Sequence, residues 1–301
     1  MRVLLTGASS SPGYKTLIEL ARKGFEVFGI YRSHTISYTN DMVHLVRLDL
    51  LQYSRTSELF SQVKPDIVIH MAALGNVDQC EMYKEDAWRI NVDVTRHLSK
   101  LSKKYNSLFL YLSTDYVFSG DEGMYKENSV PYPVNFYGLT KLVAEEIVKS
   151  ILDRDYIIVR TSAIYGLGPG RKNFGKFLIE TLSKGGKVQA IIDQWLSPTL
   201  NTLLAKALVE LIEKNVSGTY HVAGERISRY EFALKLAEIF GFNKDLIEPA
   251  HMSDFNWYAK RPRDSSLDCS KAKEIISIEF NSIEYSLKTL YREWREEMFK
   301  S

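Results

Sequence analysis

Short apolar runs alternate with longer amphipathic stretches through the first half of the chain. Residues 2–6 form a run of valine and leucine that a glycine ends, and residues 12–23 carry apolar side chains at helical spacing. The same alternation predicts strands at 26–31, 44–48, 66–70, 108–113 and 156–160, and helices at 54–63, 80–104 and 137–151. Continuous apolar runs are typical of parallel strands that are buried on both faces.

The pattern changes after Gly166, where the segment YGLGPGRKN forms a glycine-rich loop. Helices are then expected near 172–184, 199–214, 228–240 and 282–299, with a short strand at 219–223. We therefore predict an α/β fold. A Rossmann-type, doubly wound parallel sheet would occupy residues 1–165, and a smaller, mostly helical substrate domain residues 166–301, with some exchange of chain between the two.

Composition excludes several classes of protein. The 301 residues are 45% hydrophobic and 25% charged with a net charge of +2, which favours an ordinary globular protein with no nucleic-acid or membrane partner. Two cysteines are too few for a disulfide framework, and no Cys/His cluster predicts a metal site. The apolar run that stops at Gly7 is too short for a signal peptide, so we expect a cytoplasmic protein.

The turn between the first strand and the first helix predicts a dinucleotide site. Gly7 and Gly13 would let the backbone approach a pyrophosphate, and the helix that begins near Ser11 and Pro12 would offer its free N–H groups. Ser10 stands where such turns usually have a glycine. Its side chain would either crowd the phosphates or bond them through its hydroxyl.

The end of the second strand bears on which cofactor is bound. Enzymes that use NAD usually place a carboxylate there to hold the ribose 2′-hydroxyl, whereas this chain has Tyr31, Arg32 and Ser33. A guanidinium forms strong, charge-assisted bonds with a phosphate. Arg32 therefore favours NADPH (NADP), with NADH as the alternative.

Tyr137 and Lys141 predict an acid–base centre. The two lie four residues apart, on one face of a helix, and Tyr137 is the only one of 18 tyrosines with a lysine at this spacing. A neighbouring ammonium lowers the pKa of a phenol, which lets the phenol exchange a proton with a substrate. The preceding strand ends in Ser113 and Thr114, and one of these hydroxyls would polarise a carbonyl.

Further segments resemble the extended short-chain dehydrogenase/reductases and, among them, the dTDP-4-dehydrorhamnose reductases. They are HMAALGNVDQCE (70–81), STDYVFSG (113–120), PVNFYGLTK (133–141), VRTSAIYG (159–166), DQWLSPT (193–199) and RPRDSSLD (261–268). The resemblance covers nearly the whole chain. It departs from the family at Ser10 and in the segment from Thr114 to Tyr137, which is one residue shorter than usual.

The resemblance implies a role for each matching residue. Thr114 would bind the substrate carbonyl, Tyr137 would donate the proton, and Lys141 would tune the tyrosine and hold the nicotinamide ribose. With the phosphate turn, the expected cofactor contacts are Gly7, Ser10, Ser11, Pro12, Gly13, Tyr31, Arg32, Asp49, Leu50, Ala72, Ala73, Tyr137 and Lys141. The expected substrate contacts are Val77, Asp115, Trp195 and Arg261.

Some of these matches also have structural explanations. Asp78 and Glu81 have the spacing of a capping box, and Trp195 would equally pack in a core. Asn91 would either support the active site or mark a helix kink whose side chain bonds the backbone. Arg261 and Arg263, held by the rigid Pro262, would clamp a nucleotide diphosphate, with a surface cluster as the alternative.

The function implied by the resemblance is reduction of the C4 ketone of a nucleotide-linked 4-keto-6-deoxy sugar by NADPH, as in dTDP-L-rhamnose synthesis. Two alternatives stay open. One is a nucleotide-sugar epimerase, and the other is an NAD(P)-binding regulatory subunit similar to the beta subunit of methionine adenosyltransferase. The expected partners are a nucleotide-diphosphate sugar and a second copy of the chain, since dimers are the commonest oligomers.

Overall fold

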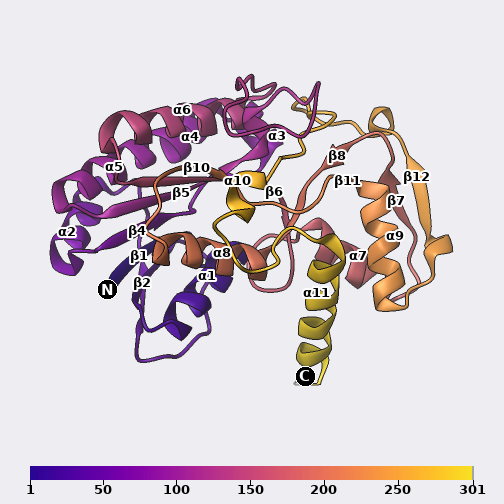
Figure 1. The fold of residues 1–301 in the computed structure, drawn as a ribbon, viewed down its shortest axis with the longest axis horizontal. Helices are drawn as coiled ribbons and strands as arrows, with labels where there is room; N and C mark the ends of the chain where they lie inside the picture. Colours follow the sequence, from indigo (N-terminus) through magenta and orange to yellow (C-terminus); the bar gives the residue numbers. More distant parts are fainter. Residues whose placement is uncertain (300–301) are drawn as a thin grey trace.

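A parallel β-sheet forms the centre of the protein in the computed structural model, which describes residues 1–299 (Figure 1). The sheet has the order β10-β6-β5-β4-β1-β2-β3, and every neighbouring pair is parallel. Its strands are β1 (Arg2–Thr6), β2 (Glu26–Tyr31), β3 (Val43–Arg47), β4 (Ile67–His70), β5 (Leu108–Thr114), β6 (Tyr156–Tyr165) and β10 (Gly218–His221). The predicted parallel Rossmann-type sheet is confirmed.

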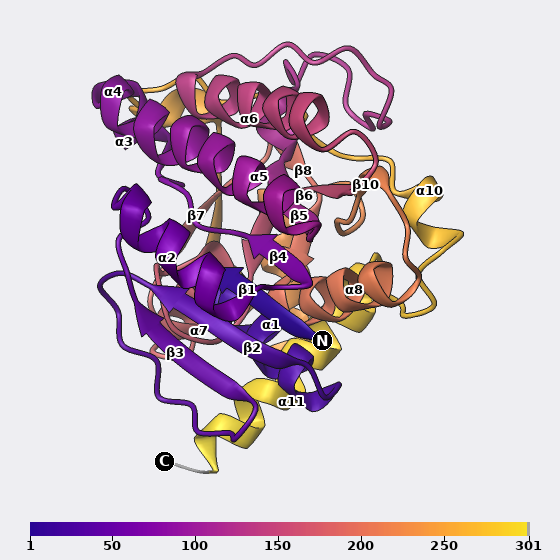
Figure 2. The same ribbon diagram turned by 90° about the vertical axis from the view of Figure 1, so that its left-hand side faces the viewer.

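Helices cover both faces of this sheet (Figure 2). One face carries α1 (Ser11–Arg22) and α8 (Asn201–Glu213), and the other carries α2 (Tyr53–Val63), α5 (Val94–Tyr105) and α6 (Phe136–Leu152). Side chains alternate along β1, so Val3 and Leu5 belong to one hydrophobic core and Leu4 to the other. Hydrophobic cores therefore cover both faces of the sheet, and the loops that follow the strands lie at its carboxyl edge.

The predicted single helix over 80–104 is wrong. The structure divides it into α3 (Val77–Met82), α4 (Lys84–Trp88), a π-helical segment (Arg89–Asp93) and α5. The π-helical segment carries Asn91, whose side chain bonds the backbone of Leu74 in a distant loop. The helix is therefore interrupted at Asn91, where a kink was one of the two roles weighed from the sequence.

A smaller lobe lies beside one end of the sheet and is drawn on the right of Figure 1. Its elements are α7 (Phe174–Leu182), β7 (Val188–Ile191), β8 (Trp195–Leu196), β11 (Ile227–Ser228), α9 (Arg229–Phe240), β12 (Ile247–Ala250) and α11 (Ile283–Met298), whereas β9 (Pro198–Leu200) pairs with β6 and α10 (Ser270–Lys273) packs beside β10. In this lobe β7 pairs with β12, and β8 pairs with β11. The chain also returns to the main sheet through α8 and β10.

Lys300 and Ser301, the last residues of the predicted substrate domain, lie outside the described residues. Between residues 1 and 299, none of the helices has the length and apolar character needed to cross a membrane.

Candidate active site

The phosphate turn is built by two glycines that have no room for a side chain. Gly7 has a φ of +73°, and a Cβ there would lie 2.8 Å from the Ala72 nitrogen. A Cβ at Gly13 would lie 2.2 Å from the carbonyl oxygen of Gly7. The Ser10 hydroxyl donates to that same oxygen at 2.7 Å and accepts from the Gly13 N–H at 3.1 Å. Ser10 therefore caps α1 and shapes the turn.

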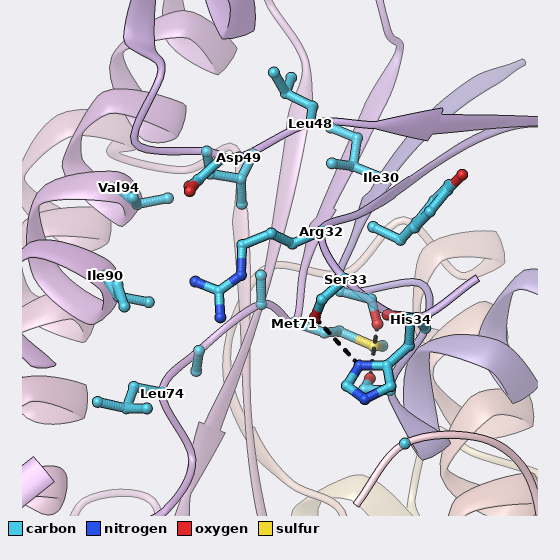
Figure 3. Close-up of a pocket in the computed structure, with 18 of the residues that line it drawn as sticks. Ile30, Arg32, Ser33, His34, Leu48, Asp49, Met71, Leu74, Ile90 and Val94 are labelled. Carbon is cyan, nitrogen blue, oxygen red and sulfur yellow. Dashed lines mark hydrogen bonds between the residues drawn. The ribbon is translucent and has the colours of Figure 1, made fainter. Parts of the chain in front are cut away.

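A cavity of about 290 Å³ opens beside this turn, at the carboxyl edge of β1, β2 and β4 (Figure 3). Most of the expected cofactor residues line it: Gly7, Ser10, Tyr31, Arg32, Asp49, Leu50, Ala72 and Ala73. Ser11, Pro12 and Gly13 lie behind the turn, in the first turn of α1. Tyr137 and Lys141 lie on α6, outside this lining.

The chemistry of this cavity fits a dinucleotide that carries a 2′-phosphate. Figure 3 shows the Arg32 side chain directed into the cavity, with Ile90 and Val94 among the apolar residues around it. Arg32 pairs with no carboxylate among residues 1–299, and β2 ends without an acidic residue. An unpaired guanidinium at the end of β2 can hold a phosphate.

Several lining residues were missed by the sequence analysis. They are Ser33, His34, Leu48, Leu51, Met71, Leu74, Ile90, Val94, Gly170 and Arg171, together with Ser9 and Ile30. Most of them follow a strand that the pattern predicted, so the sequence did indicate that they lie at the carboxyl edge of the sheet. Gly170 and Arg171 come from the glycine-rich loop of the other half of the chain, which offered no such signal.

Thr114 and Tyr137 lie together at the end of β5. The Thr114 hydroxyl donates to Asp115 Oδ1 at 3.0 Å and also interacts with the Tyr137 phenol. Asp115 Oδ2 in turn accepts from the hydroxyls of Ser162 and Ser265. With Asp115 only 3% exposed and both of its oxygens occupied, its role here is to fix Thr114 and not to face a substrate, contrary to our expectation.

Ser113 points to the opposite side of the strand, as expected from strand geometry. Its hydroxyl donates to Glu145, which also forms a bidentate ion pair with Arg160. Arg160 and Glu145 are fully buried at 2% and 0% exposure. Glu145 lies on α6 and Arg160 on β6, so this ion pair joins the helix that carries Tyr137 to the central sheet.

Lys141 is buried, and its Nζ donates to the Leu112 carbonyl oxygen at 2.7 Å. The same Nζ lies 4.1 Å from the centre of the Tyr111 ring. Burial lowers the pKa of Lys141 to about 7, although the nearby Glu145 and Cys80 act in the opposite direction.

Our expectation that Lys141 lowers the pKa of Tyr137 is wrong for this structure. Burial raises the pKa of the Tyr137 phenol, and the Thr114 hydrogen bond opposes this only in part. The lysine ammonium is engaged by the Leu112 carbonyl. The phenol therefore keeps its proton near neutral pH, which suits a group that donates a proton.

The lowered pKa of Lys141 makes stability depend on pH. Between about pH 7 and 10.5 the folded lysine is neutral whereas the unfolded one binds a proton, so the free energy of unfolding rises with pH through this window. Relative to Lys141→Met, the wild type should gain on the order of 2 kcal/mol between pH 7 and pH 9. Urea unfolding at the two pH values measures this. An equal difference at both values would contradict the assigned shift.

Asn91 connects the cofactor side of the site with the catalytic helix. Its Oδ1 accepts from the Leu74 N–H at 2.8 Å, and its Nδ2 donates to Thr140 Oγ1 at 3.0 Å. Thr140 precedes Lys141 on α6. Both of the roles that we weighed for Asn91 therefore apply, since it interrupts a helix and also supports the active site.

A second cavity, of about 570 Å³, opens in the smaller lobe. Arg229 and Arg261 both line it, together with the aromatic side chains of Phe174, Phe177, Phe255 and Trp257. Arg229 donates to Gln194 and Arg261 pairs with Asp78; burial lowers the pKa of Arg229, and Arg261 acts in the same direction. Such a pair favours an anionic ligand.

Tyr116 lies between this cavity and the proton donor. Its ring packs edge-on against Tyr137 with centroids 6.1 Å apart, and its phenol is within electrostatic reach of Arg229 and Arg261. Neither Tyr116 nor Tyr137 is among the residues that line the second cavity, so Tyr116 is the link between the cavity arginines and Tyr137. Phe174, Arg229, Phe255 and Trp257 belong to no motif that we recognised in the sequence.

The structure brings only Arg261 of the four expected substrate residues into this cavity. Val77 begins α3, and Trp195 in β8 has Arg226 and Arg263 beside its ring at 5.0 and 5.9 Å. The ring therefore packs against cations. Arg263 is not among the residues that line this cavity, whereas Arg229 lines it together with Arg261.

The capping-box explanation for Asp78 is also wrong. The side chain that caps α3 is Asn76, which accepts from the N–H groups of Asp78 and Gln79. Asp78 instead pairs with Arg261 at 2.8 Å and accepts from the Ala259 N–H at 2.9 Å. It fixes Arg261 at the cavity.

Together, a parallel Rossmann sheet, a glycine phosphate turn and a tyrosine–lysine pair at its carboxyl edge define an oxidoreductase of the extended short-chain dehydrogenase/reductase type. Within residues 1–299, no group of His, Cys, Asp and Glu has the arrangement of a metal site. The chain belongs to the family described as RmlD substrate binding domain, which matches residues 1–296.

Individual relatives span nearly the whole chain. The probable low-salt glycan biosynthesis reductase Agl14 of Haloferax volcanii is 31% identical over 295 residues, or 96% of this chain and 97% of that protein. The dTDP-4-dehydrorhamnose reductase of Bacillus anthracis, solved in complex with NADP, superposes with a TM-score of 0.85 at 29% identity, covering 97% and 99% of the two chains. The family resemblance in the sequence is thereby confirmed.

The methionine adenosyltransferase 2 subunit beta of Bos taurus is also similar, at 26% identity over 284 residues. The match covers 91% of this chain and 82% of that protein. Proteins similar to this chain thus include both reductases and a subunit of another enzyme.

Proposed function

We propose that this protein uses NADPH to reduce the C4 ketone of a nucleotide-linked 4-keto-6-deoxy sugar, as dTDP-4-dehydrorhamnose reductases do. One observation carries the proposal: the Tyr116 ring packs against Tyr137 and lies within electrostatic reach of Arg229 and Arg261, which line a cavity with aromatic walls. A nucleotide diphosphate offers an aromatic base and two phosphates to such a cavity. The family of the chain and the names of its relatives support the same substrate class.

Each residue of the cofactor side has a defined task. NADPH supplies the hydride when it is bound. Arg32 holds the 2′-phosphate, the phosphate turn at Gly7 and Gly13 receives the pyrophosphate, and Lys141 hydrogen-bonds the nicotinamide ribose. Arg32 therefore sets the preference for NADPH over NADH.

On the substrate side, Tyr137 donates its proton to the ketone oxygen at C4. Its raised pKa keeps the phenol protonated near pH 7, which suits reduction. Thr114 donates its hydroxyl to Asp115 and also interacts with the phenol, which orients the Tyr137 side chain. Arg229 and Arg261 bind the diphosphate of the substrate, and the base lies against Phe174 or Trp257.

Removal of Arg229 should weaken substrate binding selectively. We expect Arg229→Met to raise the KM for the nucleotide sugar by about tenfold or more, because a charge-assisted bond to phosphate is lost, and to leave the Kd for NADPH unchanged. Arg226→Met is the matched control, since Arg226 pairs with Asp264 outside the cavity. Equal KM values for the two variants would contradict the assigned diphosphate site.

The function itself is tested by NADPH oxidation at 340 nm with dTDP-4-keto-6-deoxy sugar, compared with the same sugar without its nucleotide. We expect turnover only with the nucleotide-linked sugar. Conversion of the sugar without net loss of NADPH would favour the epimerase. Tight NADPH binding without turnover, together with recovery of a stoichiometric catalytic partner, would favour the regulatory subunit.

A further inference from the structure

The glycine-rich loop that connects the two halves of the chain lies across the phosphate turn. Gly170, with a φ of +92°, has its backbone against the turn: a Cβ there would lie 3.2 Å from the Ser11 nitrogen and 3.2 Å from the Ser9 carbonyl oxygen. Gly168 approaches the Tyr14 ring of α1. The loop and the turn are thus in direct contact, although 160 residues separate them in the sequence.

A fully buried asparagine fixes this contact. Asn201, the first residue of α8, donates from Nδ2 to Ser11 Oγ and to the Leu167 carbonyl oxygen, both at 2.7 Å. A Cβ at Gly166 would lie only 2.1 Å from Asn201 Oδ1, so the loop closes tightly on this side chain. The position of the loop over the turn is therefore determined by buried hydrogen bonds.

This arrangement brings Arg171 to the cofactor cavity. Arg171 follows Gly170 directly and lines the same cavity as Arg32. Neither guanidinium has a carboxylate or ring partner in the part of the chain that the structure describes. Asp49 is the one acidic residue among the lining residues, and its Oδ1 accepts from the Leu51 N–H. The cavity is therefore lined by two arginines, Arg32 after β2 and Arg171 in the glycine-rich loop, that have no carboxylate partner among residues 1–299.

We propose that Arg171 is a cofactor-binding residue that binds the pyrophosphate of the dinucleotide beside the phosphate turn. The proposal rests on the proposed dinucleotide cofactor and adds a ligand from the other half of the chain. Arg32 at the end of β2 meets the 2′-phosphate, whereas Arg171 lies next to the residues that shape the phosphate turn. A guanidinium can bind two phosphate oxygens at once, which suits this position.

The test compares the Kd values of NADPH and NADH, by titration calorimetry, for the wild type and three variants. Arg171→Ala should weaken both dinucleotides by about tenfold, since both carry the pyrophosphate. Arg32→Ala should weaken NADPH alone. Lys172→Ala is the matched control, because it removes a neighbouring charge that pairs with Glu180, and it should change neither Kd.

The outcomes separate this inference from the proposed function. Unchanged Kd values for Arg171→Ala, or a loss confined to NADPH, would overturn the assignment to the pyrophosphate while the wild type still binds its cofactor. A wild type that binds neither dinucleotide would contradict the proposed function itself. Arg171→Lys, which keeps the positive charge, should recover part of the lost affinity, and thermal unfolding confirms that each variant is folded.

Discussion

Tyr137→Phe is expected to lower kcat for reduction of the keto sugar by roughly 10²- to 10⁴-fold, the usual contribution of a positioned proton donor. The substitution removes only the hydroxyl that Thr114 orients, and the ring keeps its edge-on contact with Tyr116. The Kd for NADPH should therefore stay the same. Steady-state turnover at 340 nm and calorimetry measure the two quantities.

Tyr132→Phe is the matched control for this variant, because Tyr132 is 72% exposed and precedes the same helix. Its kcat should equal that of the wild type. If Tyr137→Phe retained more than about half of the wild-type kcat, a proton donor at this position would be ruled out. A parallel loss of NADPH binding would mean that the Tyr137 hydroxyl contributes to holding the cofactor and not only to proton donation.

Arg160→Met should destabilise the protein by about 3–5 kcal/mol, the cost of leaving one partner of a buried ion pair unpaired. Arg160 bonds both oxygens of Glu145 and also donates to the Glu127 carbonyl oxygen. Without it, the hydrogen bond that Glu145 keeps among residues 1–299 is the one from the Ser113 hydroxyl. The buried carboxylate would then lack its counter-charge behind the catalytic helix.

Urea unfolding measures this cost. The double variant Arg160→Met, Glu145→Leu should be more stable than Arg160→Met alone, because it removes both charges together. Arg154→Met, on the exposed turn before β6, should change the free energy of unfolding by less than about 0.5 kcal/mol. A cost below about 1 kcal/mol for Arg160→Met would contradict the role of this pair.

Much of the fold could be predicted because each central strand is a continuous apolar run. Strands β1, β2 and β5 and the helices α1 and α6 lie where the pattern placed them. A kink at Asn91 was one of the two roles weighed from the sequence, but its backbone partner could not be predicted, since Leu74 lies in a loop 17 residues away. The short strands of the smaller lobe, such as β8 and β11, lack the length that makes a periodic pattern visible.

The candidate site could be predicted where the spacing of residues along the chain has a direct chemical meaning. The glycines of the phosphate turn and the spacing of Tyr137 and Lys141 have a local physical meaning, so the sequence indicates them. Orientation was not predictable. Asp115 faces three hydroxyls, and the ring of Trp195 faces two arginines, although both residues match family segments. Arg229 acquires its role only when α9 packs beside β7.

The central claim is that hydride reaches the C4 carbon of a nucleotide-linked sugar in this site. The most direct measurement uses NADPH deuterated at both C4 positions of the nicotinamide, with dTDP-4-keto-6-deoxy sugar as substrate, and reads the product by NMR. We expect one deuterium on C4 of the product sugar, formed by the wild type and roughly 10²- to 10⁴-fold more slowly by Tyr137→Phe. A reduced product without deuterium at C4, or no product despite bound NADPH, would contradict the central claim.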